Sequence, residues 1–136
     1  MKQKDKVFFD VAAKIAKLSN HPRVKIGCVV VEHGRIISSG ANSYTKTHPI
    51  QKRLDKLRFD GETTAKVHAE VAALVPLIKN KTDLSKARIY VYREHKDGSL
   101  GCSRPCCGCM SLIKECGIKR VLYTNNEGYV CEDLKL

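Results

Sequence analysis

Two short segments of the 136-residue chain combine side chains that can bind a transition metal. One holds His68 and Glu70, and the other holds Cys106 and Cys109 directly after Pro105. One imidazole and two thiolates leave one position of a tetrahedral zinc ion open, as is typical of catalytic rather than structural zinc. Glu70 lies near enough to His68 in the sequence to exchange protons with a water molecule at the open position, without being a metal ligand itself. We therefore expect His68, Cys106 and Cys109 to bind Zn²⁺ and Glu70 to be the catalytic acid and base.

This pattern, His-x-Glu followed by Pro-Cys-x-x-Cys, resembles the signature of the zinc-dependent cytidine and deoxycytidylate deaminase superfamily. The resemblance runs from about Val24 to Tyr123. It implies a hydrolytic deaminase of a cytosine-type base, with a nucleophilic water on zinc and Glu70 as the proton shuttle. It also implies that the backbone amide of Ala69 lies near the carbonyl of the base. The expected fold is an α/β, three-layer α/β/α sandwich with a mixed sheet of about five strands, formed by one domain over residues 1–136.

Candidate substrate contacts follow from the same resemblance. Gly40-Ala41-Asn42 matches a Gly-x-Asn in which the asparagine amide contacts the sugar or base, although Asn42 could instead simply accommodate turn geometry. Tyr44 and Arg104 are further candidates. Free-cytidine deaminases usually have cysteine as the first ligand and an Asn-x-Glu for the ribose. This chain has His68 and Asn42-Ser43-Tyr44, which favours a (deoxy)cytidine nucleotide such as dCMP over a nucleoside.

Two alternatives stay open. A nucleic-acid-editing deaminase of single-stranded DNA or tRNA adenosine would need stacking aromatic side chains, and loop 43–66 offers only Tyr44 and Phe59. A non-catalytic, zinc-stabilised binding module would result if Cys102 closed the site as a fourth ligand. Cys107 cannot share the metal-facing side of a helix with Cys106 and Cys109, so we expect it to be a packed or partly exposed thiol.

Composition limits the partners and the compartment. The net charge of +11 favours an anionic partner, and residues 1–25 carry seven basic against two acidic side chains. A solvated basic surface kept for solubility explains this charge equally well. No apolar run is long enough to span a membrane, and the first residues do not form a signal peptide. The odd number of seven cysteines fits metal binding in a reducing compartment. We expect a cytoplasmic protein, and the resemblance implies a homo-oligomer.

Hydrophobic periodicity predicts the helices that position the metal ligands. One amphipathic helix is expected over residues 4–18, and the stripe that packs on a sheet consists of Val7, Val11, Ile15 and Leu18. A second helix is expected to begin at Ala69 and to end or kink at Pro76. A third carries Cys106 and Cys109 on one face of its first turn.

The remaining segments predict the sheet and one wall of the pocket. Residues 26–31 are apolar on both faces, as expected for a sheet covered by helices on both sides. A short helix over residues 51–59 is expected in a long loop that forms a wall of the pocket. Strands are expected at residues 26–31, 35–39, 87–92, 119–124 and 129–131, the last as the return strand of a hairpin.

Overall fold

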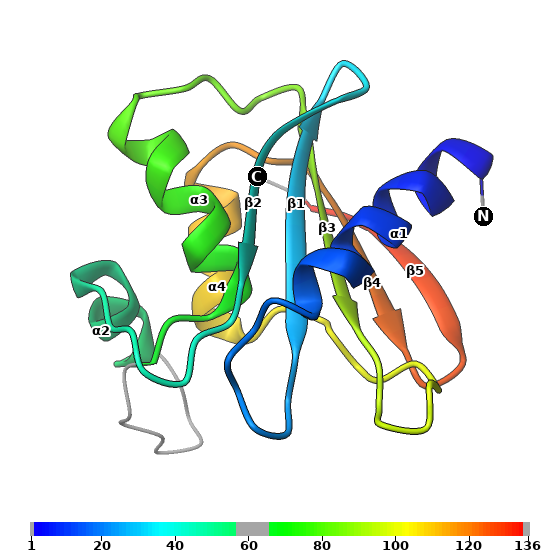
Figure 1. Cartoon of the computed structure of the whole chain (residues 1–136). Coiled ribbons are helices and arrows are strands. Elements are labelled where there is room, and N and C mark those ends of the chain that lie inside the picture. Colours follow the sequence, from blue (N-terminus) through cyan, green and yellow to red (C-terminus); the bar gives the residue numbers. More distant parts are fainter. Residues whose placement is uncertain (1, 57–65, 135–136) are drawn as a thin grey trace.

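A computed structural model of the chain describes residues 2–56 and 66–134. In this part of the chain a five-stranded sheet has the strand order β2-β1-β3-β4-β5 (Figure 1). The strands β3 and β4 are parallel and the other neighbours are antiparallel. The strands are β1 (Ile26–Glu32), β2 (Arg35–Ala41), β3 (Ala87–Arg93), β4 (Arg120–Asn125) and β5 (Gly128–Asp133). The predicted mixed sheet and the predicted hairpin at its last strand are both confirmed.

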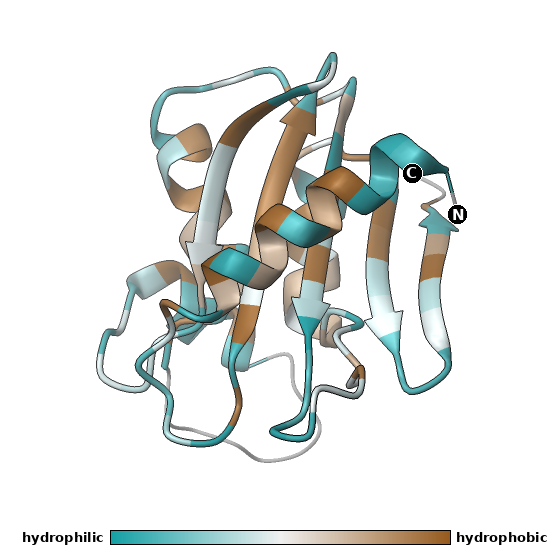
Figure 2. Ribbon diagram, turned by 45° about the vertical axis from the view of Figure 1, so that its right-hand side comes forward, coloured by the Kyte–Doolittle hydropathy of each residue, from teal (hydrophilic) through white to brown (hydrophobic). Residues whose placement is uncertain are grey.

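Helices cover both faces of this sheet (Figure 1). Helix α1 (Gln3–Ala16) packs on one face, and the other face carries α2 (Pro49–Asp55), α3 (Ala69–Lys79) and α4 (Cys107–Glu115). The sheet between them is apolar on both sides, and Figure 2 shows the hydrophobic central strands. In β1, Val29 and Val31 face α1, whereas Cys28 and Val30 belong to the core under α3. The three-layer α/β/α sandwich is therefore confirmed.

The packing face of α1 differs from the prediction. Val7 and Leu18 are 52% and 75% exposed, and the helix ends at Ala16. The buried residues are instead Asp5, Phe9, Ala12 and Ala16. The reason is a close approach to β1, because a Cβ on Gly27 would lie 2.0 Å from the carbonyl oxygen of Ala12. Only small side chains fit at such a contact, so Ala12 and Ala16 take the centre of the interface, and Val11 and Ile15 of the predicted stripe pack at its edge as partly buried residues.

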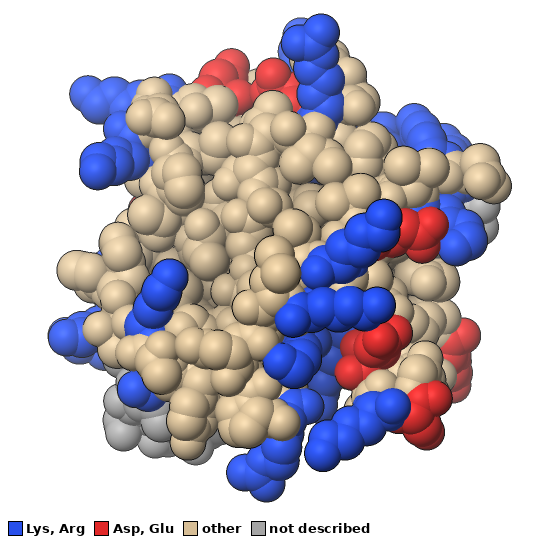
Figure 3. Space-filling view, in the orientation of Figure 1, with Lys and Arg blue, Asp and Glu red and all other residues tan. Residues whose placement is uncertain are grey.

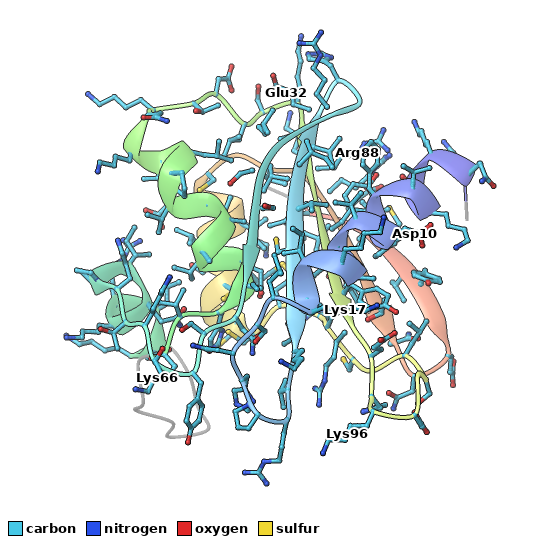
Figure 4. The ribbon with its side chains drawn as sticks, in the orientation of Figure 1. Asp10, Lys17, Glu32, Lys66, Arg88 and Lys96 are labelled. Carbon is cyan, nitrogen blue, oxygen red and sulfur yellow. The ribbon has the colours of Figure 1, made fainter. Side chains whose placement is uncertain are left out.

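The polar residue on that buried face has its own partners. The hydroxyl of Tyr90 donates a hydrogen bond to the carboxylate of Asp5 at 2.5 Å. Arg88, labelled in Figure 4, lies 3.8 Å from the same carboxylate. A buried carboxylate is tolerated only when it is paired in this way. Asp5 therefore fixes the start of α1 on β3, which the hydrophobic pattern alone does not indicate.

Helix α3 lies close against the edge strand β2. A Cβ on Gly40 would lie 2.6 Å from the backbone nitrogen of Ala73, and the hydroxyl of Ser38 donates to the Ala73 carbonyl at 2.6 Å. The helix continues through Pro76 to Lys79, so the proline does not end it. This contact places the first turn of α3 beside the end of β2.

The loop before α3 differs in part from the prediction. Helix α2 begins at Pro49 rather than at residue 51 and ends at Asp55, and Phe59 lies outside the described residues.

No helix in the described part of the chain is long and apolar enough to cross a membrane.

Candidate metal centre

The three predicted metal ligands meet where two helices begin. His68 is the N-cap residue of α3, Cys106 is the N-cap residue of α4, and Cys109 lies in the first turn of α4. The Nδ1 atom of His68 is 3.7 Å from Sγ of Cys106 and 3.4 Å from Sγ of Cys109, and all three atoms lie within 4.8 Å of one another. A tetrahedral zinc ion with ordinary bond lengths separates nitrogen and sulfur ligands by about 3.6 Å. The donor set therefore fits Zn²⁺ in both identity and spacing.

One detail of the prediction for the cysteine pair is wrong. Cys106 does not lie in the first turn of α4 but precedes it with extended backbone angles, φ −65° and ψ 168°. Its sulfur accepts a hydrogen bond from the backbone N–H of Cys109 at 3.5 Å. Thiolates accept such bonds, and the helix N-terminus favours negative charge. The capping position therefore turns both sulfurs toward His68.

The two thiols are electrostatically unequal. The side-chain hydrogen bond from the Cys109 thiol lowers the pKa of Cys106 to about 3, and smaller contributions come from His68 and from the backbone N–H of Cys109. The pKa of Cys109 is raised well above its ordinary value by the bond to Cys106 and by burial. Cys106 is therefore a thiolate at neutral pH, which is the form that binds a metal.

Glu70 lies in the first turn of α3, beside these ligands. Its side chain is 4% exposed, and burial raises its pKa, whereas the neighbouring His68 lowers it. Behind it, burial and the proximity of Glu70 raise the pKa of Cys28, so that thiol stays protonated in the core. A buried carboxyl beside an open metal position is suited to proton transfer.

Gln51 in α2 supports His68, a role that could not be predicted from the sequence. Its side chain is 0% exposed, and its Oε1 accepts a hydrogen bond from the backbone N–H of His68 at 3.0 Å. Its Nε2 donates to Asp55 at 2.8 Å. This contact fixes the N-cap residue of α3, which has no side-chain cap of its own. A glutamine among lysines and arginines has no pattern that distinguishes it from a solvent-facing residue.

A buried pair of hydroxyls holds the loop that leads to Cys106. The Oγ atoms of Ser103 and Thr124 lie 2.9 Å apart. Ser103 donates to the Val91 carbonyl at 2.8 Å, and Thr124 donates to the Gly101 carbonyl at 2.7 Å. The loop is therefore tied to the ends of β3 and β4. Neither residue stood out in the sequence, because isolated hydroxyl side chains are common in loops.

A cavity of about 510 Å³ opens beside the metal ligands. His68, Ala69, Glu70 and Cys106 line it, so the predicted catalytic residue and two of the three predicted metal ligands face one space, whereas Cys109 is fully buried beside them. Besides Ala69, it is lined by the other three predicted substrate contacts, Asn42, Tyr44 and Arg104.

These three residues differ in their existing contacts. The amide group of Asn42 accepts from the Ile26 N–H at 2.9 Å and donates to the Val24 carbonyl at 2.8 Å, so it also joins the start of β1 to the end of β2. The exposed Tyr44 packs edge-on against His21, with ring centroids 5.2 Å apart. Arg104 forms a two-bond ion pair with Glu132 of β5, at 3.1 and 2.9 Å.

Cys102 lines the cavity as an exposed residue, but it does not belong to the metal-binding group. In the described residues that group consists of His68, Cys106 and Cys109. Cys107 is exposed, as predicted for a thiol turned away from the metal. A zinc ion held by these three residues would therefore have an open fourth position, which a structural zinc site lacks.

The cavity is positively charged. Its described lining includes Lys66, Arg93 and Arg104, against Glu70 as the acidic residue. Figure 4 shows Lys66 below α2, beside the loop that joins β2 to α2, and Figure 3 shows further Lys and Arg side chains over the lower part of this face. A cleft with cationic walls attracts anionic ligands.

Comparison with known proteins agrees with this geometry. Residues 2–125 match the family described as the cytidine and deoxycytidylate deaminase zinc-binding region. The deoxycytidylate deaminase of Mycobacterium phage D29 is 33% identical over 132 residues, which cover 88% of this chain and 92% of the phage protein.

Solved structures show the same fold. The dCMP deaminase of cyanophage S-TIM5, in complex with dCMP and dUMP, superimposes with a TM-score of 0.65 at 26% identity, over 92% of this chain and 84% of that one. The cytidine deaminase of Burkholderia pseudomallei gives a TM-score of 0.67 at 18% identity, over 98% and 93% of the two chains, and shows the fold alone.

Proposed function

The chain belongs to the cytidine and deoxycytidylate deaminase family with its zinc-binding region, and from this premise we propose that it deaminates dCMP to dUMP with release of ammonia. The observation that carries the proposal is one cavity that holds His68, Cys106 and Glu70 beside cationic side chains. The cationic walls favour a substrate with a phosphate over a free nucleoside. The similarity to deoxycytidylate deaminases supports the same choice.

The metal ligands and Glu70 divide the chemistry between them. When bound, zinc supplies a water whose pKa is lowered to about 7 and which can therefore attack at neutral pH. His68, Cys106 and Cys109 would hold the metal; Cys109 would lose its proton on metal binding, and the two thiolates would balance the charge of the ion. Glu70 would take a proton from the water and pass it to the ring nitrogen. The oxygen of the water would bond to the ring carbon that carries the amine, and Glu70 would take its second proton and give it to the amine, which leaves as ammonia. One carboxyl therefore serves as base and then as acid in each half of the reaction.

The backbone of α3 contributes a fixed donor. Ala69 is the first residue of α3, and the first N–H groups of a helix have no acceptor within the helix. We assign this N–H to the carbonyl of the cytosine ring. Gln51 fixes the backbone of His68, the residue before Ala69. The Ala69 N–H and the metal ligand His68 are therefore held in fixed positions relative to each other.

The nucleic-acid alternative has less support. It requires a row of stacking aromatic side chains, and of the two predicted candidates Tyr44 lines the cavity, whereas Phe59 lies outside the described residues.

Intracellular nucleotide pools would supply dCMP, which suits a cytoplasmic enzyme. Homo-oligomerisation stays a prediction, which size-exclusion chromatography with light scattering tests.

Ammonia release from a panel of substrates tests the proposal. Zinc-loaded protein is incubated with dCMP, deoxycytidine, CMP and short single-stranded oligonucleotides, and dCMP should give the highest kcat/KM. Removal of zinc by a chelator should abolish turnover, and added zinc should restore it.

A pair of matched variants tests the role of Glu70. Glu70→Gln should retain zinc and the fold but lose turnover by orders of magnitude. Glu127→Gln, in an exposed turn, is the matched control. Turnover of Glu70→Gln at the wild-type rate, or wild-type protein inactive on every compound, would refute the proposal.

A further inference from the structure

Arg93 ends strand β3 at the edge of the sheet where the cavity opens. Its pairing partner on the adjacent strand β1 is Ile26, which also lines the cavity. Side chains alternate along a strand, and Tyr90 and Tyr92 face α1. Arg93 therefore projects to the opposite face of the sheet, where α3 and α4 carry the metal ligands.

The cationic side chains of the cavity are not equivalent. Arg104 is already paired with Glu132 by two hydrogen bonds. The contact of the Arg93 guanidinium is a long one, 3.5 Å from its Nη1 to the neutral carbonyl oxygen of Cys102. Within the described residues, no carboxylate lies in ion-pair distance of Arg93. This guanidinium can therefore accept an anionic ligand without breaking an existing ion pair.

The side chain of Arg93 is held in position before any ligand binds. A Cβ on the buried Gly101 would lie 3.2 Å from Cγ, Cδ and Nε of Arg93, so the loop packs directly on the arginine stem. The backbone is held as well, because the Arg93 carbonyl accepts from the N–H of Gly101 at 2.9 Å. The hydroxyl of Thr124 accepts from the Arg93 N–H at 3.2 Å. A side chain fixed in this way loses little entropy when it binds a ligand.

We propose that Arg93 recognises the phosphate of the nucleotide and makes the enzyme prefer dCMP over deoxycytidine, an inference that rests on the proposed deaminase activity. A guanidinium presents a planar pair of N–H donors that matches two oxygens of a phosphate. Loss of a hydrogen bond between charged groups costs a factor of about 10 to 100 in binding. Since deoxycytidine lacks the phosphate, its turnover does not depend on this contact.

The decisive measurement is the ratio of kcat/KM for dCMP to that for deoxycytidine. Arg93→Gln should lower this ratio about 10- to 100-fold, with deoxycytidine turnover unchanged. Arg93→Lys keeps the charge without the paired donors and should give an intermediate ratio. Gly101→Ala keeps the arginine but crowds its stem, and should lower the ratio several-fold.

The matched control is Arg35→Gln, an exposed arginine at the start of β2 that does not line the cavity. It should leave the ratio unchanged. Calorimetric titration with dUMP and deoxyuridine gives a readout that is independent of turnover. Arg93→Gln should bind dUMP about 10- to 100-fold more weakly than the wild type and bind deoxyuridine equally well.

The outcomes separate the two proposals. If the wild type deaminates no cytosine compound, the proposed function fails, and the dUMP titration alone decides the role of Arg93. Folded Arg93→Gln protein that keeps the wild-type ratio, or the wild-type affinity for dUMP, would overturn the assignment. If Arg93→Gln does not fold, as circular dichroism would show, then Arg93→Lys and Gly101→Ala decide it by the same two measurements.

Discussion

Replacing Gln51 by leucine removes the side chain that holds the backbone of His68. The Gln51 side chain is fully buried, and its Oε1 lies 3.0 Å from the backbone nitrogen of His68. Leucine has a similar volume and good helix propensity, so α2 should still form. The backbone N–H of His68 would then lose its acceptor in a partly buried position.

The expected cost follows from that unpaired group. A donor left without its partner away from water costs about 1–3 kcal/mol. If this free energy is lost from the arrangement of the metal ligands, the zinc affinity decreases by about 10- to 100-fold. The control is Lys52→Leu, which adds the same side chain to α2 at the neighbouring exposed position.

Two assays measure the effect. Urea unfolding followed by circular dichroism gives the free energy of unfolding with and without zinc, and competition with a chromophoric chelator gives the zinc affinity. Gln51→Leu should be impaired in both, and Lys52→Leu in neither. If Gln51→Leu matches the wild type in unfolding free energy and zinc affinity, then the contact to His68 does not support the metal site.

Two further substitutions test other supports of the site. Thr124→Val removes the hydroxyl that contacts the Gly101 carbonyl and Ser103. It should lower the free energy of unfolding, measured by urea titration, by about 1–3 kcal/mol. The control Thr47→Val, at an exposed position, should not lower it. Glu132→Gln weakens the pair with Arg104. In the wild type this pair holds the pKa of Glu132 below its ordinary value. The stabilisation that the pair provides is therefore present above about pH 4.3 and is lost as the pH falls. The variant should therefore be less stable than the wild type by up to about 1 kcal/mol at pH 7 and by less at pH 3.5, and an equal difference at both pH values would contradict the reasoning.

Much of the fold could be predicted from local patterns. The apolar run of β1 and the hairpin that ends in β5 were both expected, because alternation and turn residues are properties of neighbouring positions. The face on which α1 packs could not be predicted. That face depends on Gly27, a residue of β1 that allows the Ala12 backbone to approach, and the helical periodicity of α1 itself contains no information about it.

The candidate site divides in the same way. His68, Glu70, Cys106 and Cys109 could be identified from the sequence, because the members of each pair are only two or three positions apart and their chemistry limits what they can bind. Gln51 and Arg93 could not be identified. Gln51 reaches His68 from another helix, and Arg93 meets the cavity only because β3 ends beside β1 in the folded sheet. Metal donors depend on residue type and short spacing, whereas the groups that support them and contact the substrate depend on contacts that exist only after folding.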